Sequence, residues 1–187
     1  MGPSGSGKST LLNLISLIDR PTNGSIKFEN IQVNFNDKDK NDIFRAKKIG
    51  IVYQQNNLLP DFTALENLYL ASLSINDNKK MAMLKAEKLL KKIGLTSRSD
   101  HFPSQLSGGE SQRVAIARAI INDPDIILAD EPTGSLDMKT AKDIFALLNN
   151  QKKRNRLIIF ATHNRFFAKK ADYLLELTNG SIKSTNA

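Results

Sequence analysis

The first ten residues, MGPSGSGKST, contain residue types that can hold a phosphate group. In the pattern Gly2-x-x-x-x-Gly7-Lys8-Ser9, the glycines let backbone N–H groups turn toward phosphate oxygens without a Cβ in the way. Lys8 can place its charge beside the β- and γ-phosphates, and Ser9 can offer a hydroxyl to Mg²⁺. Chance alone yields this pattern in about one chain in a hundred of this length, so it needs support from elsewhere. We predict ATP binding by Gly2, Pro3, Ser4, Gly5, Ser6, Gly7, Lys8, Ser9 and Thr10.

A second candidate site is the acidic pair Asp130-Glu131, which follows the apolar run 126–129. A short apolar run of this kind is typical of a buried strand in a parallel sheet. The carboxyl end of that strand would lie at the sheet edge that also carries the phosphate loop. There Asp130 suits the Mg²⁺ shell, and Glu131 is placed to polarise an attacking water. An exposed acidic pair at a strand end is common by itself, so this interpretation depends on the phosphate loop beside it.

A third candidate is the string LSGGESQR, residues 106–113. Ser107-Gly108-Gly109 at the start of a helix would expose N–H groups at the positive end of the helix dipole, which favours an anion. The alternative is an ordinary capped helix with flexible glycines. Two phosphate-binding segments far apart in one chain pose a geometric problem. It is solved if ATP lies between the loop of one copy and the helix tip of another, which predicts a homodimer.

Periodicity and turn residues predict an α/β fold, with strands alternating with helices and a parallel sheet covered on both faces. We expect helices over 8–18, 39–48, 64–73, 79–93, 107–121 and 140–150, and strands over 25–28, 49–53, 126–129, 157–161 and 173–177. Capping-box pairs begin two of these helices, at Thr63/Glu66 and Ser107/Glu110. The string NGSIK occurs at 23–27 and 179–183, and we interpret both copies as hairpin turns. We predict a single domain, with a core of about 1–59 and 122–187 and an inserted helical subdomain of about 60–121.

Composition adds little to the assignment of function. The chain of 187 residues carries a net charge of +8 and no cysteine, which excludes disulfides and thiolate metal sites. A basic surplus can indicate nucleic-acid binding, but the basic residues are scattered and no aromatic side chains interleave with them. We therefore interpret the charge as a solvated surface and expect no nucleic-acid partner.

Taken together, these motifs resemble the ATPase subunits of ATP-binding-cassette (ABC) transporters over essentially the whole chain. Gly2–Thr10 is similar to the Walker A loop, Asp130-Glu131 to the end of the Walker B strand, and LSGGE at 106–110 to the specific signature motif. Further similar residues are Gln54 of the Q-loop, Ser135-Leu136-Asp137 of the D-loop and the switch histidine His163. The resemblance implies a P-loop NTPase fold with a RecA-like sheet core.

The resemblance also implies roles for individual residues. Gln54 and His163 would join Glu131 as catalytic residues, and Gln54 would join Ser9 and Asp130 at Mg²⁺. Ser107, Gly108, Gly109 and Asp137 would contact ATP in the opposite copy. Two positions depart from the usual family pattern. Asn164 replaces an acidic residue, and Ser111 replaces a longer polar residue of the signature.

The segment 56–67, NNLLPDFTALEN, closely resembles lipoprotein-releasing ATPases of the LolD type. This resemblance implies a peripheral homodimer on the cytoplasmic face of an inner membrane. It also implies docking to integral permease subunits of the LolC/LolE type, powering release of lipoproteins toward the outer membrane. Macrolide-efflux and cell-division systems share much of this pattern. A DNA-repair or chromosome-structuring ATPase is a further alternative, but the span from Gln54 to Leu106 has no room for a long coiled coil and no sustained heptads.

In the family, a strand and an adenine-stacking aromatic residue precede the phosphate loop, and here Met1 takes the place of the last residue of that strand. We therefore expect an N-terminally truncated sequence, from a misassigned start or a decayed gene. Each buried backbone group left unpaired costs about 1–3 kcal/mol, so the short form would fold poorly. An inactive remnant is accordingly another alternative.

Overall fold

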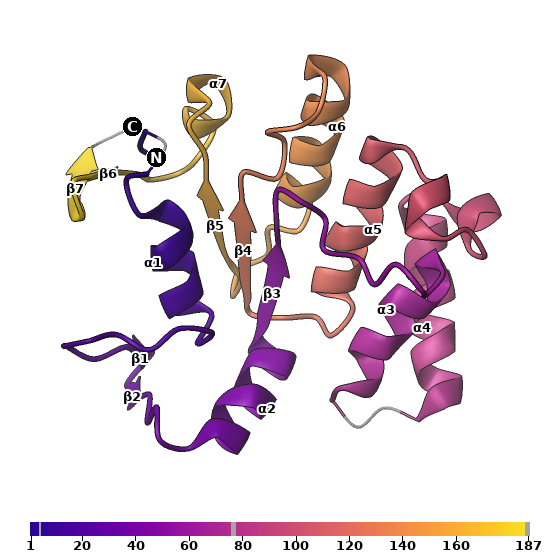
Figure 1. Ribbon diagram of the computed structural model, residues 1–187, viewed down its shortest axis with the longest axis horizontal. Helices are drawn as coiled ribbons and strands as arrows, with labels where there is room; N and C mark the ends of the chain where they lie inside the picture. Colours follow the sequence, from indigo (N-terminus) through magenta and orange to yellow (C-terminus); the bar gives the residue numbers. More distant parts are fainter. Residues whose placement is uncertain (4, 76–77, 186–187) are drawn as a thin grey trace.

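The computed structural model describes residues 1–3, 5–75 and 78–185 (Figure 1). Its centre is a three-stranded parallel sheet in the order β3 (Ile49–Val52), β4 (Ile126–Asp130) and β5 (Leu157–Ala161). The register pairs Val52 with Ala129 and Asp130 with Ala161. All three strands therefore end at the same edge of the sheet. The predicted parallel sheet is confirmed.

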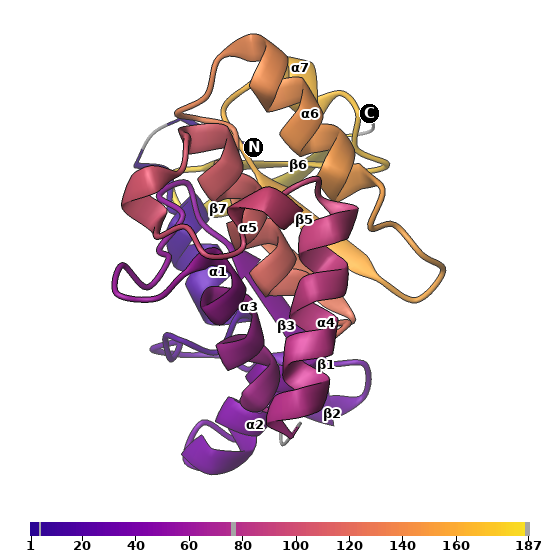
Figure 2. The same cartoon turned by 90° about the vertical axis from the view of Figure 1, so that its right-hand side faces the viewer.

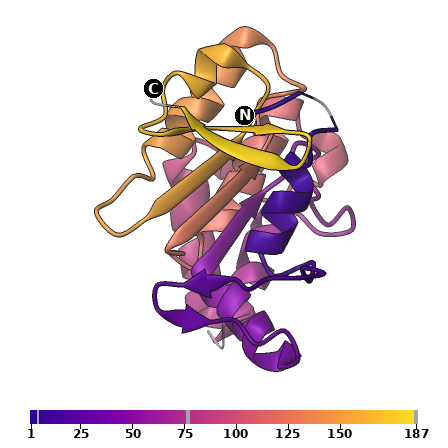
Figure 3. The ribbon, with the colours of Figure 1, turned by 90° about the vertical axis from the view of Figure 1, so that its left-hand side faces the viewer.

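Helices cover both faces of this sheet, as predicted. On one face α5 (Gly108–Ile120) and α6 (Met138–Asn149) pack on the strands and bury the side chains of Ile116, Ile127 and Ile144. On the other face, seen in Figure 3, α1 (Lys8–Ile15) buries Leu12 against Leu128. A Cβ at Gly50 would lie 2.2 Å from the carbonyl oxygen of Ala119. Glycine at this position of β3 therefore lets α5 approach the sheet closely.

A helical layer lies outside α5 (Figure 2). It consists of α3 (Ala64–Leu73), α4 (Lys79–Lys92) and the short 3₁₀ turns η1 (Thr96–Arg98) and η2 (Pro103–Gln105). Val114 and Ala117 of α5 pack with this layer, whereas Ile116 and Ile120 pack on the sheet. One helix thus serves both hydrophobic clusters. We propose residues 60–121 as the helical subdomain, with α5 as the element that joins it to the core.

Most of the predicted element ends lie within two residues of the observed ends. Both predicted capping boxes are present, and Gly94 has a φ of +72° after α4. The first helix is shorter than predicted, because it ends at Ile15 instead of Ile18. Leu17 adopts a left-handed φ of +61°, which ends the helical path. The carbonyl of Asn13 then accepts hydrogen bonds from the amides of Ile18 and Asp19.

Of the two NGSIK strings, only the second is a hairpin turn. Asn179-Gly180 joins β6 (Leu174–Thr178) to β7 (Ser181–Thr185). The prediction for the first string was wrong. The first hairpin consists of β1 (Lys27–Phe28) and β2 (Ile31–Gln32), and its turn is Glu29-Asn30, with a φ of +53° at Glu29. The sequence did not predict β2 and α7 (Arg165–Ala168), nor the two 3₁₀ turns η1 and η2.

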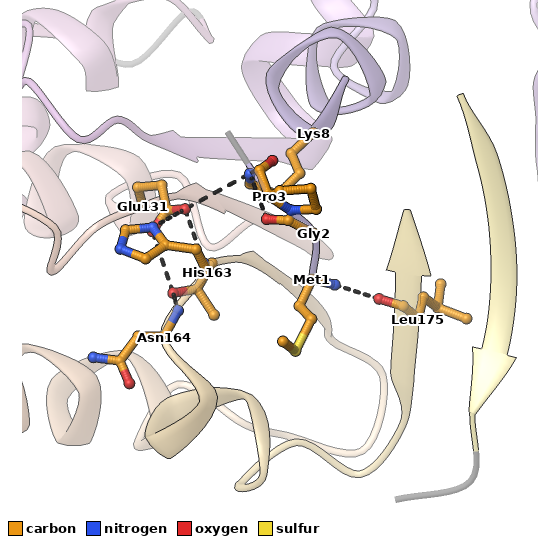
Figure 4. Close-up of polar contacts among 9 residues, drawn as sticks. Met1, Gly2, Pro3, Lys8, Glu131, His163, Asn164 and Leu175 are labelled. Carbon is orange, nitrogen blue, oxygen red and sulfur yellow. Dashed lines mark hydrogen bonds and ion pairs between the residues drawn. The ribbon is translucent and has the colours of Figure 1, made fainter. Parts of the chain in front are cut away.

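The residue before the phosphate loop is held by the C-terminal hairpin (Figure 4). The amino group of Met1 donates to the carbonyl of Leu175, and the Met1 carbonyl accepts from the amide of Leu177 at 2.7 Å. This pair of bonds has the pattern of a parallel bridge and fixes the start of the loop beside β6. Among the described residues, no helix is long and apolar enough to cross a bilayer.

Candidate functional site

The phosphate loop is an open polar turn that leads into α1. Gly5 and Gly7 have φ values of +78° and +97°, which residues with a Cβ rarely adopt. The Lys8 ammonium donates to the carbonyls of Gly2 and Pro3, both at 2.9 Å, and so bridges the start of the loop (Figure 4). The hydroxyl of Ser6 is buried and has no partner among the described residues. Ser4, also predicted to bind ATP, lies outside the described residues.

Glu131 is the centre of a hydrogen-bonded cluster at the end of β4. Its Oε1 accepts from the backbone N–H of His163 at 2.9 Å and lies 2.8 Å from Nδ1 of the same residue. Its Oε2 accepts from the hydroxyl of Thr162 at 3.2 Å, and its Oε1 is 3.9 Å from the Lys8 ammonium. With Glu131 ionised, the Nδ1 of His163 carries the proton in this contact. Three residues predicted from separate motifs therefore lie together (Figure 4).

The backbone of Glu131 explains this orientation. Its amide donates to the Ala161 carbonyl at 2.9 Å, which extends the ladder between β4 and β5 by one residue. Its φ of +44° then turns the chain away from the sheet. Asn164, where the family usually has an acidic residue, accepts from the Phe166 amide at 2.9 Å and so caps α7. A neutral amide is therefore sufficient to begin that helix.

Of the three predicted Mg²⁺ ligands, Asp130 has a feature that suits the metal. The Oδ1 of Asp130 is buried and has no partner among the described residues, so it is available as a ligand. Gln54 lies against Gly134, where an added Cβ would be 2.9 Å from the Gln54 amide nitrogen. In the described part of the chain, no three His, Cys, Asp or Glu side chains form a metal cluster. A single carboxylate with a hydroxyl and an amide suits Mg²⁺, which keeps several waters and binds substrate phosphates.

The signature segment is held by a capping box and lies beside the predicted D-loop. Ser107 begins α5, and its backbone N–H donates to Glu110 at 2.8 Å. A Cβ on Gly109 would lie 2.6 Å from the methyl group of Thr140 at the start of α6. Asp137 caps α6 by accepting from the amides of Lys139 and Thr140. Within one chain, α5 and the phosphate loop lie on opposite sides of the sheet (Figure 1).

The Glu110 carboxylate stabilises this helix tip and has a pKa of about 2. The main cause is the hydrogen bond from the Ser107 backbone, and the contact with Arg98 at 3.1 Å adds to it. Arg98 in turn contacts the ring of His101 at 3.1 Å. Sequence reasoning assigned His101 to a loop and did not identify Arg98, because this contact depends on how η1 folds against α5.

We expect Glu110→Gln to make folding less sensitive to acid. A depressed carboxyl pKa contributes stability above its ordinary value of 4.5, and this contribution is lost as the pH falls toward 2. The wild-type unfolding temperature should therefore fall more steeply between pH 4.5 and 2 than that of the variant. Circular dichroism melts measure this slope. Glu87→Gln, on the exposed face of α4, is the control. Equal slopes for Glu110→Gln and the wild type would contradict the assignment.

The comparisons with known proteins agree with this geometry. The family described as ABC transporter matches residues 1–134. The lipoprotein-releasing system ATP-binding protein LolD of Rickettsia bellii is 45% identical, over 97% of this chain and 80% of that protein. LolD of Wigglesworthia glossinidia brevipalpis is 46% identical, over 100% of this chain and 82% of that protein.

A solved structure gives the same result for the fold. The dimeric post-hydrolysis state of the ATP-binding cassette MJ0796, bound to ADP and Pi, superposes with a TM-score of 0.88 at 39% identity. The match covers 100% of this chain and 84% of that one. The predicted P-loop NTPase fold is therefore confirmed. The family match, the close relatives and the shared fold together show that this chain belongs to the ABC transporter family, as an ATP-binding subunit.

Proposed function

We propose that this chain hydrolyses ATP to power the release of lipoproteins from an inner membrane toward the outer membrane. The observation that carries the ATPase proposal is the cluster in which Lys8, Glu131 and His163 meet at one end of the sheet. Two facts support the lipoprotein assignment. The relatives named above carry the name of lipoprotein-releasing ATPases, and segment 56–67 resembles that group.

In the proposed site, Glu131 is the base that polarises the attacking water, and His163 holds that carboxylate in place. When bound, ATP would supply the phosphoryl group that is transferred, and Mg²⁺ would neutralise the negative charge of the phosphate oxygens. Ser9, Gln54 and Asp130 are the proposed Mg²⁺ ligands. The glycines of the loop and Lys8 hold the triphosphate, and the buried hydroxyl of Ser6 and carboxylate oxygen of Asp130 are free to join this site.

A complete site requires two copies in this proposal. Ser107 and Gly108 are exposed at the tip of α5, where the Ser107 hydroxyl and the Gly108 N–H can meet a phosphate of the opposite copy. Gly109 and Asp137 belong to the same surface. The separation of the two phosphate-binding segments within one chain supports this arrangement, as does the dimeric state of the MJ0796 cassette.

The proposed partner is a membrane permease of the LolC/LolE type, which would hold the dimer at the cytoplasmic face as a peripheral subunit. Loop 56–62 supports this proposal because it exposes Leu59 and Phe62 on a fixed backbone. The buried side chain of Asn67 makes three hydrogen bonds to this loop, including a bond from the Leu59 amide at 2.8 Å, and a fourth to the Thr63 carbonyl. A cavity of about 510 Å³ between α2 (Lys38–Lys48), β3, α3 and α5 adjoins the loop through Arg118.

We expect Phe62→Asp to abolish co-purification with the permease pair and ATP-driven lipoprotein release from vesicles, because it places a charge in the apolar docking surface. ATP binding should be retained. Ile31→Asp is the matched control, since Ile31 is 74% exposed on β2, outside that loop. If the wild-type protein failed to release lipoproteins but powered the transport of another substrate, the lipoprotein assignment would be contradicted. Normal assembly of Phe62→Asp would remove the loop from the docking surface.

A further inference from the structure

Two side chains of α5 hold the backbone on either side of Gln54. Before it, the Gln112 amide donates to the Tyr53 carbonyl at 3.2 Å. After it, the Arg118 guanidinium donates to the carbonyls of Asn57 at 2.7 Å and Asn56 at 3.1 Å. The helix whose tip carries the signature residues therefore also holds the loop that carries Gln54.

Arg118 is a half-buried cation with an unusual set of partners. Burial lowers the pKa of its guanidinium, yet within residues 1–3, 5–75 and 78–185 it forms no ion pair with a carboxylate. Partial burial of a cation is costly unless its N–H donors have acceptors, and here the acceptors are two successive carbonyls of one loop. The planar fork of arginine suits two adjacent acceptors better than the single ammonium of lysine.

The loop that Arg118 holds turns sharply just after Gln54. Asn57 has a left-handed φ of +47°, a conformation that asparagine tolerates better than most residues with a Cβ. The bonds from Arg118 hold the carbonyls on either side of the Asn56–Asn57 step. They therefore help to define the path of the chain immediately after Gln54.

This path determines where Gln54 lies. Its amide packs on Gly134, at the bend that follows Glu131, and the Gly134 amide donates to the Glu131 carbonyl at 2.9 Å. A shift of the loop would move Gln54 relative to the acidic end of β4.

We propose that Arg118 is a positioning residue for Gln54, which it holds toward the acidic end of β4 by fixing the Asn56 and Asn57 carbonyls. The inference rests on the proposed function, because it requires a role for Gln54 in hydrolysis. Among the described residues Arg118 makes no hydrogen bond to the phosphate loop, so in the chain without permease its effect on hydrolysis passes through Gln54. Its loss should therefore slow turnover more than it weakens ATP binding.

A double-mutant cycle on kcat and KM for ATP tests this proposal, using the whole chain alone and assembled with its permease. Arg118→Lys should lower kcat by about 10- to 100-fold, the usual effect of a small misplacement, with KM changed less than about twofold. In a Gln54→Ala background, Arg118→Lys should change kcat less than about twofold. Effects on kcat that multiply independently would overturn the proposal. Gln112→Met, which keeps the side-chain shape without the donor, should show the same dependence on Gln54.

Arg156→Lys is the matched control. The Arg156 side chain is 5% exposed and donates to the carbonyls of Pro124 at 2.8 Å and Gln151 at 3.3 Å. This variant should lose stability without a loss of kcat that depends on Gln54. The same coupling to Gln54 in both arginine variants would overturn the inference. Failure of the proposed function looks different, because wild-type protein would then fail to hydrolyse ATP or Gln54→Ala would keep wild-type kcat.

Discussion

Replacing Glu131 with glutamine should lower kcat by about 10²–10⁴-fold and leave ATP bound, because the amide cannot accept a proton from the attacking water. The substitution keeps the size of the side chain. One amide oxygen can still accept from the backbone N–H of His163, which lies 2.9 Å from Oε1 in the wild type. The fold should therefore be preserved and only the chemical step lost. Single-turnover hydrolysis together with nucleotide retention on gel filtration measures both effects.

Asp143→Asn is the control for the charge change, since Asp143 is an exposed acidic residue on α6. It should leave kcat unchanged. A Glu131→Gln protein that retains ATP and hydrolyses it within tenfold of the wild-type rate would remove Glu131 from the role of general base.

Replacing Lys8 with alanine should weaken ATP binding by about 10²-fold or more. A hydrogen bond to a charged group contributes about 1.5–3 kcal/mol, and Lys8 is placed to make two with the β- and γ-phosphates. The substitution also removes the two bonds at 2.9 Å by which Lys8 bridges the carbonyls of Gly2 and Pro3. Loss of these bonds should loosen the loop that must present its N–H groups. Isothermal titration with ATP measures the change in Kd.

The control for Lys8→Ala is Lys92→Ala, which removes an exposed ammonium from the end of α4. Its Kd should equal that of the wild type. If Lys8→Ala bound ATP with wild-type affinity, the phosphate loop would not be the nucleotide site.

Elements with strong local signals could be predicted from the sequence. Thr63 and Ser107 begin α3 and α5 because the reciprocal bonds of a capping box depend only on residues three apart. Leu17 is a counter-example. Its apolar side chain continues the helical pattern of α1, but the side chain is buried after the backbone has left the helix. Tertiary packing determined that end, and no local pattern encodes it.

In the candidate site, too, residues in recognisable motifs could be predicted, whereas residues placed by tertiary contacts could not. The phosphate-loop pattern indicated Lys8, the acidic pair indicated Glu131, and the family resemblance indicated His163. The carboxyl ends of parallel strands then bring Glu131 and His163 to one edge of the sheet. Thr162 and Arg118 were not identified as functional. Arg118 reaches carbonyls 61 and 62 residues earlier in the chain, and backbone acceptors leave no mark in the sequence. Thr162 is 1% exposed at the end of β5, and a hydroxyl in that position was the only available signal.

The central claim is that ATP binds between two copies of this chain, and the mass of the Glu131→Gln protein saturated with ATP tests it most directly. Light scattering on a sizing column should give close to twice the 20.8 kDa of one chain with ATP, and a single chain without it. Ser107→Arg in the same background should prevent this doubling, because it blocks the tip of α5. A Glu131→Gln protein that is saturated with ATP and still monomeric would contradict the account.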